Sequence, residues 1–145
     1  MIRTVIVSLD VVSNSIEEIK FDANTFDFFK KLKENRFKLG ITSDWSKNET
    51  NNAVDVLEIR PFLDVILSNE DVINPKPHPE IYFKAFDLLN VSHKSVLVIE
   101  ESEVGLKAAR KADCFIWRIE DKKDINFGKI NDVIGKINSV IAKHE

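Results

Sequence analysis

The sequence predicts an α/β fold in which helices cover both faces of a doubly wound parallel sheet. Short apolar runs of strand length alternate about five times with segments of helical periodicity, the order expected for such a sheet. No repeat, low-complexity tract or linker interrupts this alternation. The 145 residues match one ordinary domain, so we expect residues 1–145 to form a single core domain.

The expected strands share one signature, an apolar run that ends in polar residues. The run Ser-Val-Leu-Val-Ile at 95–99 is the most strand-like of them, because it is apolar and rich in valine and isoleucine. The expected strands are residues 5–9, 37–41, 65–67, 95–99 and 114–119.

The expected helices are recognised by apolar residues at helical spacing and by local start signals. Ser46 and Glu49 have the spacing of a capping box, Asn24 can cap the first helix, and Pro79 suits a first helical turn. We expect Pro61 to stop the helix that Ser46 opens. The expected helices are residues 25–34 and 46–58, a helix after Pro79, a small-residue helix at 105–112, and a closing helix with an apolar stripe at 130–141.

Composition excludes several classes of protein. The formal net charge is −3 and no basic stripe is present, which argues against a nucleic-acid partner. No apolar run reaches membrane-spanning length and no signal-peptide pattern is present, so we expect a cytoplasmic protein without a membrane partner. The single cysteine, Cys114, excludes an internal disulfide and a cysteine-cluster metal site.

Polar residues gather where the expected strands end. In a parallel sheet these ends lie along one edge, where ligands bind. Hydroxyl groups and a lysine can hold phosphate oxygens, and carboxylates can hold Mg²⁺ beside them. Each group alone has an ordinary explanation, as a solvated turn, a surface lysine or a helix cap. The residues are Ser8 and Asp10, Thr42 and Ser43, Lys76 in a proline-rich loop, and Glu100 with Glu101.

Three stretches carry a family resemblance. "NPKPHPEIYFKAFDLLN" resembles the lysine motif of the haloacid dehalogenase superfamily, in the branch of β-phosphoglucomutase and related sugar-phosphate phosphatases. "SVLVIEESEVGLKAARKA" resembles the acidic motif of that branch, and "FKLGITSDWS" is similar to its Ser/Thr motif. The likeness spans nearly the whole chain and implies a three-layer, Rossmann-like core.

The resemblance also implies a role for each polar residue. Thr42 would bind the transferring phosphoryl group with Ser43 beside it, and Lys76 would neutralise the phosphate. Asp10 would be the general acid and base, and its backbone carbonyl would be a metal ligand. Glu101, with Glu100, would hold Mg²⁺.

The first motif departs from the family pattern Asp-x-Asp-Gly. Ser8 stands where the family has its nucleophilic aspartate, and Val11 replaces the glycine. A serine hydroxyl is a poor nucleophile unless a base takes its proton. The metal site also loses an anionic ligand, so we expect weakened Mg²⁺ binding.

A second departure is the absence of a cap domain between the first motif and the next helix. Residues 11–23 leave room only for a short hairpin flap, expected at residues 16–21, where this branch inserts a helical cap. We therefore expect an open site, suited to a macromolecular substrate or closed by another subunit.

The sequence thus favours a phosphatase-like core with a largely retained phosphate and Mg²⁺ site and weak or absent phosphatase activity. One alternative is a divergent hydrolase or phosphotransferase that still acts on phosphomonoesters. Another is a non-catalytic scaffold that binds a phosphorylated small molecule, a phosphoprotein or another partner. A third is that Ser8 accepts phosphate, or is itself an engineered change. A homo-oligomer is also left open.

Overall fold

The computed structural model describes residues 1–144 and contains one five-stranded sheet. Every pair of neighbouring strands is parallel, and the strand order is β3-β2-β1-β4-β5, so β1 is central. The strands are β1 (Thr4–Ser8), β2 (Lys38–Thr42), β3 (Val65–Leu67), β4 (Val96–Glu100) and β5 (Phe115–Arg118).

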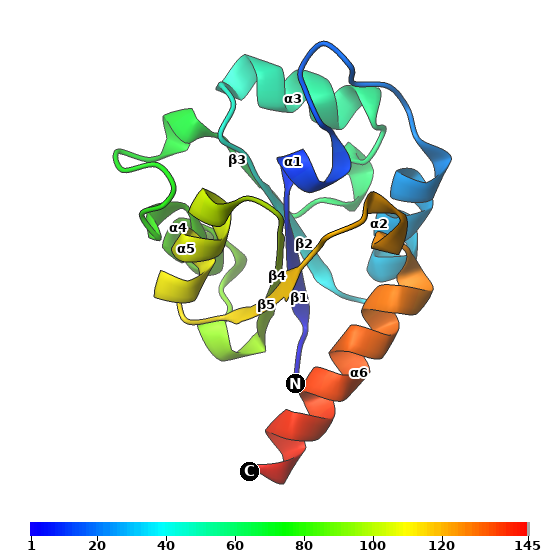
Figure 1. Cartoon of the computed structure of the whole chain (residues 1–145), viewed down its shortest axis with the longest axis vertical. Coiled ribbons are helices and arrows are strands. Elements are labelled where there is room, and N and C mark those ends of the chain that lie inside the picture. Colours follow the sequence, from blue (N-terminus) through cyan, green and yellow to red (C-terminus); the bar gives the residue numbers. More distant parts are fainter. Residues whose placement is uncertain (145) are drawn as a thin grey trace.

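Helices cover both faces of the sheet, which confirms the predicted three-layer, doubly wound α/β class (Figure 1). One buried cluster joins the sheet to α2, α3 and α6, and the other joins it to α4 and α5. The helices are α1 (Leu9–Val12), α2 (Ala23–Glu34), α3 (Lys47–Val56), α4 (Glu80–Leu89), α5 (Glu103–Lys111) and α6 (Phe127–Lys143). Single-turn 3-10 helices lie at Arg60–Phe62, Asn69–Asp71, His93–Ser95 and Lys122–Asp124.

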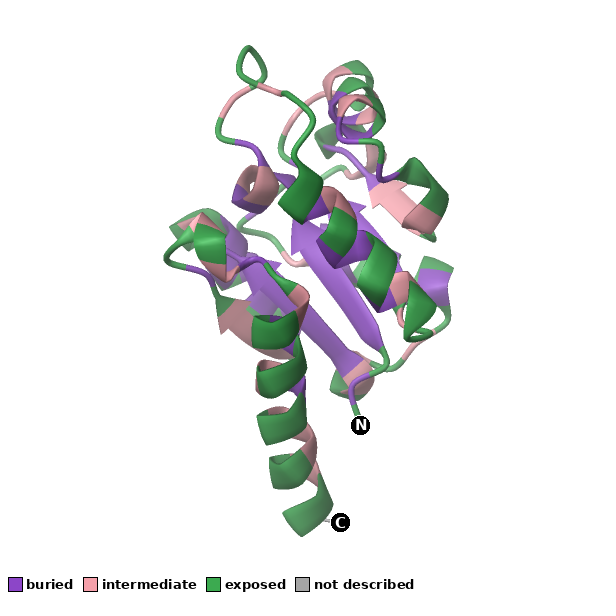
Figure 2. Cartoon of the chain, turned by 90° about the vertical axis from the view of Figure 1, so that its right-hand side faces the viewer, coloured by how far each residue is buried: buried purple, intermediate pink, exposed green. Residues whose placement is uncertain are grey.

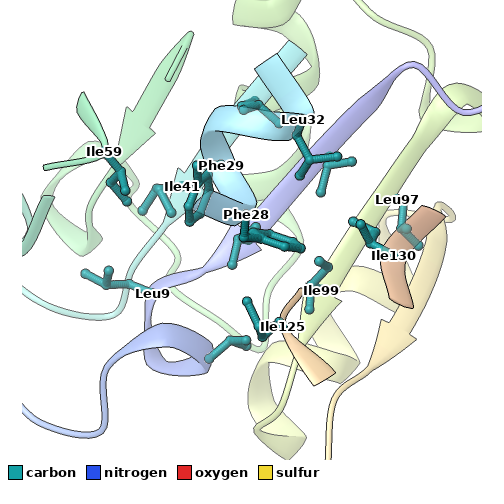
Figure 3. Close-up of a cluster of buried hydrophobic side chains, with 14 of the residues drawn as sticks. Leu9, Phe28, Phe29, Leu32, Ile41, Ile59, Leu97, Ile99, Ile125 and Ile130 are labelled. Atoms are coloured by element: carbon teal, nitrogen blue, oxygen red, sulfur yellow. The ribbon is translucent and has the colours of Figure 1, made fainter. Parts of the chain in front are cut away.

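The alternation of side chains along the central strands builds these two clusters. Val5 and Val7 of β1 face the larger cluster, whereas Ile6 faces the smaller one. Phe28 and Phe29 of α2 are fully buried and meet edge to face at a centroid distance of 5.4 Å (Figure 3). The strands are therefore buried on both sides, as Figure 2 shows for the centre of the molecule.

Most predicted strands are shifted by one residue. Residues 65–67 are confirmed, but the first strand ends at Ser8, because Leu9 already begins α1. Thr42 and Glu100, expected just beyond their strands, belong to them, since Thr42 pairs with Ser8 and Glu100 with Arg118. The polar side chains at the sheet edge are therefore held by the sheet itself.

Helix boundaries differ from the sequence prediction for local reasons. The capping box of Ser46 and Glu49 is confirmed. The predicted cap at Asn24 is wrong, because α2 begins earlier and the Asp22 carboxylate accepts the backbone N–H of Asn24 at 3.1 Å. The helix opened by Ser46 ends at Val56, well before Pro61. It ends there because the backbone becomes left-handed at Glu58 (φ 57°).

Residues 13–22 connect α1 to α2 through bends and one turn, so the predicted hairpin at 16–21 is wrong. Ile16 is out of phase with Ile19 and Phe21, so a strand over 16–21 could not bring the three apolar side chains to one face. No helix within residues 1–144 has both the length and the apolar character needed to cross a bilayer.

Candidate functional site

The sheet brings three of the predicted polar residues together at its carboxyl edge. Ser8 ends β1, Thr42 ends β2 and Glu100 ends β4, and these three strands are neighbours. All three side chains are buried. Parallel strands align their carboxyl ends, so residues far apart in sequence become adjacent here.

Lys76 links these three strand ends. Its Nζ donates hydrogen bonds to Ser8 Oγ at 3.0 Å, to Thr42 Oγ1 at 3.3 Å and to Glu100 Oε1 at 2.8 Å. The lysine reaches them from the loop before α4, and its side chain is only 1% exposed. The ammonium thus has three acceptors, which is its full donor capacity.

Glu100 is held by more than Lys76. Its Oε1 also accepts the hydroxyl of Tyr82, and its Oε2 accepts the backbone N–H of Glu101 at 3.3 Å. The carboxylate packs directly over Gly105 of α5, where a Cβ atom would come within 3.0 Å of Cδ and both oxygens. Glycine at 105 is therefore what lets the helix approach this buried carboxylate.

Tyr82 is a member of the site that the sequence reading missed. Its hydroxyl lies 3.3 Å from Thr42 Oγ1 and donates to Glu100, and the whole side chain is buried in α4. Burial and the neighbouring negative charge of Glu100 raise the pKa of the Tyr82 phenol well above its ordinary value. The available signal was a lone tyrosine at an apolar helix position, since a buried phenol needs a hydrogen-bond partner.

Asp10 lies at the mouth of the site, one turn beyond β1. Its Oδ1 accepts the hydroxyl of Ser8 at 2.7 Å, so Ser8 accepts from Lys76 and donates to Asp10. The Asp10 backbone carbonyl lies 3.3 Å from Lys122 Nζ, a second cation that the sequence reading missed. Lys122 follows β5, so the position after that strand was the signal.

Two predicted residues lie outside this hydrogen-bonded group. The Ser43 hydroxyl is used within its own loop, where it accepts the Trp45 N–H and the Thr50 hydroxyl, both at 2.9 Å. Glu101 is exposed at the start of the β4–α5 connection. Both residues adjoin the site in sequence, but neither side chain is bonded to Lys76.

The charge balance of the site disfavours a free anion. The single buried cation, Lys76, is already paired with Glu100, and the carboxylates of Asp10 and Glu101 are close in sequence to the other members. A phosphate would have to share the Lys76 ammonium with Glu100. Lys122, at the rim, is the additional positive charge that such a ligand would meet.

The predicted magnesium ligands do not form a metal site in this arrangement. Within residues 1–144, no group of three or more His, Cys, Asp or Glu side chains is placed to hold a metal ion. Both carboxylate oxygens of Glu100 already accept hydrogen bonds, from Lys76, Tyr82 and a backbone N–H. Only Asp10 and Glu101 then remain as carboxylate ligands for a metal ion. The residues present therefore do not fit a resident Mg²⁺ unless Glu100 first leaves Lys76.

Comparison with known proteins gives a consistent family likeness. The profile of haloacid dehalogenase-like hydrolases matches residues 2–119. The phosphorylated carbohydrates phosphatase of Thermotoga maritima is 30% identical over 96 residues, which cover 66% of this chain and 44% of that protein. A haloacid dehalogenase-like hydrolase domain-containing protein of Arabidopsis thaliana is 38% identical over 112 residues, which cover 73% of this chain and 35% of that protein.

The chain thus spans less than half the length of these curated relatives. Among solved structures, β-phosphoglucomutase from Clostridium difficile superposes with a TM-score of 0.71 at 26% identity, covering 88% of this chain and 62% of that one. A hydrolase of the haloacid dehalogenase superfamily from Geobacter sulfurreducens has a TM-score of 0.69 at 15% identity, and the match covers 86% of this chain and 98% of that one. At that identity the second likeness concerns the fold alone.

Proposed function

Because the chain belongs to the haloacid dehalogenase-like hydrolase family, we propose that its strand-end site binds a phosphorylated small molecule while lacking the covalent phosphatase chemistry of that family. Phosphatases of this superfamily generally use Mg²⁺. The relatives named above include a phosphatase and a phosphomutase, so phosphate esters are the ligand class that the likeness supports.

One observation carries the proposal: Ser8, which the family resemblance aligns with the nucleophilic aspartate, has its hydroxyl 3.0 Å from Lys76 Nζ. An aspartate there would contribute a charged nucleophile and a metal ligand, and serine contributes neither. Lys76 donates all its protons to Ser8, Thr42 and Glu100, so it cannot serve as the base for Ser8. Loss of a nucleophile from a catalytic group lowers rates by about 10⁶ in a well-studied protease.

The retained donors support binding. The Lys76 ammonium and the hydroxyls of Ser8 and Thr42 converge from three elements, and Lys122 adds a cation at the rim. Ser8 now donates to Asp10 and Thr42 to Tyr82, so a phosphate would have to replace these acceptors as well. A phosphate that displaced Glu100 from Lys76 would gain charge-assisted hydrogen bonds, each worth about 1.5–3 kcal/mol. The need to displace Glu100 predicts weak binding in the absence of a divalent cation.

We also propose that the ligand enters without a cap domain inserted after the first motif. The connection at residues 13–22 is short and has no helix or strand. A connection this short could not enclose a ligand and exclude water as a cap domain does, which fits binding better than protected phosphoryl transfer.

A second candidate, a serine-based hydrolase, is favoured by the 2.7 Å hydrogen bond from Ser8 Oγ to Asp10 Oδ1. In that reaction the Ser8 proton passes to Asp10 as Oγ bonds to phosphorus and the ester P–O bond breaks. The protonated Asp10 then gives its proton to the leaving alkoxide, and a phosphoserine is left at Ser8. Water then attacks this phosphorus, gives a proton to Asp10, and the Ser8 P–O bond breaks; Asp10 returns the proton to Ser8 Oγ and phosphate is released. This candidate differs from the first in forming a covalent intermediate.

Mg²⁺-dependent phosphate release from p-nitrophenyl phosphate separates the two candidates. We expect no turnover from the native chain and measurable turnover from Ser8→Asp, with Ser8→Asn as the uncharged control of similar shape. Native turnover, together with a phosphorylated Ser8 found by mass spectrometry after acid quench, would contradict the binding proposal and support the serine route.

Binding is tested separately from catalysis. Phosphate should raise the thermal midpoint of the native chain, and Lys76→Met should abolish that increase. If phosphate leaves the midpoint of the native chain unchanged with and without Mg²⁺, the site does not bind phosphate and the proposal fails.

A further inference from the structure

A large cavity lies at the amino-terminal edge of the sheet, at the opposite end from Ser8. It has a volume of about 800 Å³, within the range of small-molecule sites. We call it the N-edge cavity and define it by Arg3, Thr4, Arg36, Lys38, Asn90 and Asn131. Thr4 and Ser8 are the two ends of β1, so this cavity lies about 13 Å from the strand-end site (Figure 1).

The charges of the N-edge cavity are all positive. Arg3, Arg36 and Lys38 line it, and no aspartate or glutamate does, although the whole chain carries a net charge of −3. Within residues 1–144, neither arginine is ion-paired with a carboxylate. Lys38 Nζ donates to the Leu89 carbonyl at 2.7 Å, where α4 ends. The two guanidinium groups therefore remain available to an anion.

An unsatisfied hydroxyl lies in the wall of this cavity. Thr4 is fully buried, and its Oγ1 is the one buried side-chain oxygen or nitrogen in residues 1–144 that has no hydrogen-bond partner. This oxygen has no accessible surface, so a ligand in the cavity could reach it only if neighbouring atoms moved, and the Thr4 hydroxyl is not counted among the ligand-binding groups. The carboxamides of Asn90 and Asn131 add further neutral donors to the same wall.

Arg36 occupies a backbone position that favours glycine. It follows the end of α2 with φ 68°, and the bonds Arg36 N–H to Lys33 O and Phe37 N–H to Leu32 O form a Schellman motif. A side chain is disfavoured in this left-handed conformation, whereas glycine adopts it freely. The arginine therefore brings a cation to the cavity at the expense of local stability.

From these observations we propose that the N-edge cavity binds a small organic molecule carrying at least two negative charges. The two guanidinium groups would hold its phosphate or carboxylate oxygens, and the amides of Asn90 and Asn131 would hold its neutral polar groups. The proposal does not depend on the strand-end site, because the two sites share no residue.

The test is a titration of the full chain with tripolyphosphate and, separately, with citrate, followed by amide NMR shifts and calorimetry. We expect shifts at residues 35–38 and 90–95 and none centred on Ser8, Thr42 and Glu100. Binding of tripolyphosphate alone assigns phosphate groups as the ligand, and binding of both probes assigns a general dianion. Both results support the proposal.

Two variants separate a specific site from general charge attraction. Arg36→Gly should weaken binding about tenfold or more while raising the thermal midpoint, because it removes a charged donor and relieves the left-handed backbone. Arg110→Gln, at an exposed position of α5 outside the cavity, removes the same charge and should leave binding unchanged. Equal weakening by both variants, shifts centred on Lys76, or no binding at millimolar probe would each overturn the proposal.

Discussion

Gly105→Ala would place a methyl group against the buried carboxylate of Glu100. Alanine is favoured over glycine inside a helix by about 1 kcal/mol, so the change would stabilise α5 if nothing opposed it. The new carbon would lie within 3.0 Å of three carboxylate atoms, and the carboxylate is fixed by Lys76 and Tyr82. Either the helix moves or Glu100 leaves its partners.

The two costs can be compared. Overpacking costs about 1–3 kcal/mol, and a lost hydrogen bond to a charged group costs about 1.5–3 kcal/mol. Part of the strain is relieved when the carboxylate moves, so the two costs overlap. After the helix-propensity gain, we expect a net loss of about 2 kcal/mol in the free energy of unfolding, or roughly 4–8 °C in thermal midpoint.

Gly135→Ala is the matched control, because no atom lies within 4 Å of the added Cβ in α6. It should stabilise the protein by about 1 kcal/mol, so the two variants should differ by about 3 kcal/mol in urea unfolding. If Gly105→Ala stabilises the protein as much as Gly135→Ala, Glu100 is not held over α5 and the account of the site is wrong.

Two further predictions concern buried groups. Lys76→Met should lower the free energy of unfolding in urea by about 3–5 kcal/mol, because it leaves the Glu100 carboxylate buried without a cation. Adding Glu100→Gln should recover part of this loss, and no recovery would contradict the buried ion pair. Burial raises the pKa of the Cys114 thiol from 9.0 to about 12, so at pH 8 folded protein should react with iodoacetamide about 1,000-fold more slowly than urea-unfolded protein. Equal alkylation rates in the two states would contradict the raised pKa. The folded state binds the thiol proton more tightly than the unfolded state, so the free energy of unfolding should also decrease between about pH 9 and 12, where the unfolded thiol loses its proton first.

The sequence was sufficient for the fold class and for the main cluster of the site. Apolar runs separated by helical patterns predict a parallel sheet, and a parallel sheet places Ser8, Thr42 and Glu100 at one edge. Lys76 was placed with them because its loop follows the third strand, and the family likeness strengthened this placement, since a lysine in a proline-rich loop can equally well face solvent. Boundaries were less certain, since Thr42 and Glu100 are polar but continue the strand ladder.

What could not be predicted depends on side-chain partners. The sequence assigned Glu100 to Mg²⁺, whereas the structure pairs it with Lys76 and Tyr82, and no local pattern distinguishes these uses. Tyr82 and Lys122 were missed because each reaches the site from a helix distant in sequence. The N-edge cavity was missed as well, because Arg3, Arg36 and Asn90 meet only after the sheet has formed.

The central position of β1 also has a consequence for how the chain folds. Thr4 pairs with Lys38 on one side and with Val96 on the other, so the second pairing closes a loop of 92 residues. Closing the longer loop costs about 0.9 kcal/mol more chain entropy than closing the shorter one. During synthesis β1 can therefore pair with β2, and β2 with β3, while the other edge of β1 stays open until β4 emerges. Lys76 and Glu100 meet only when β4 pairs with β1, so this pairing and the assembly of the site are a single event, and β5 joins the sheet afterwards.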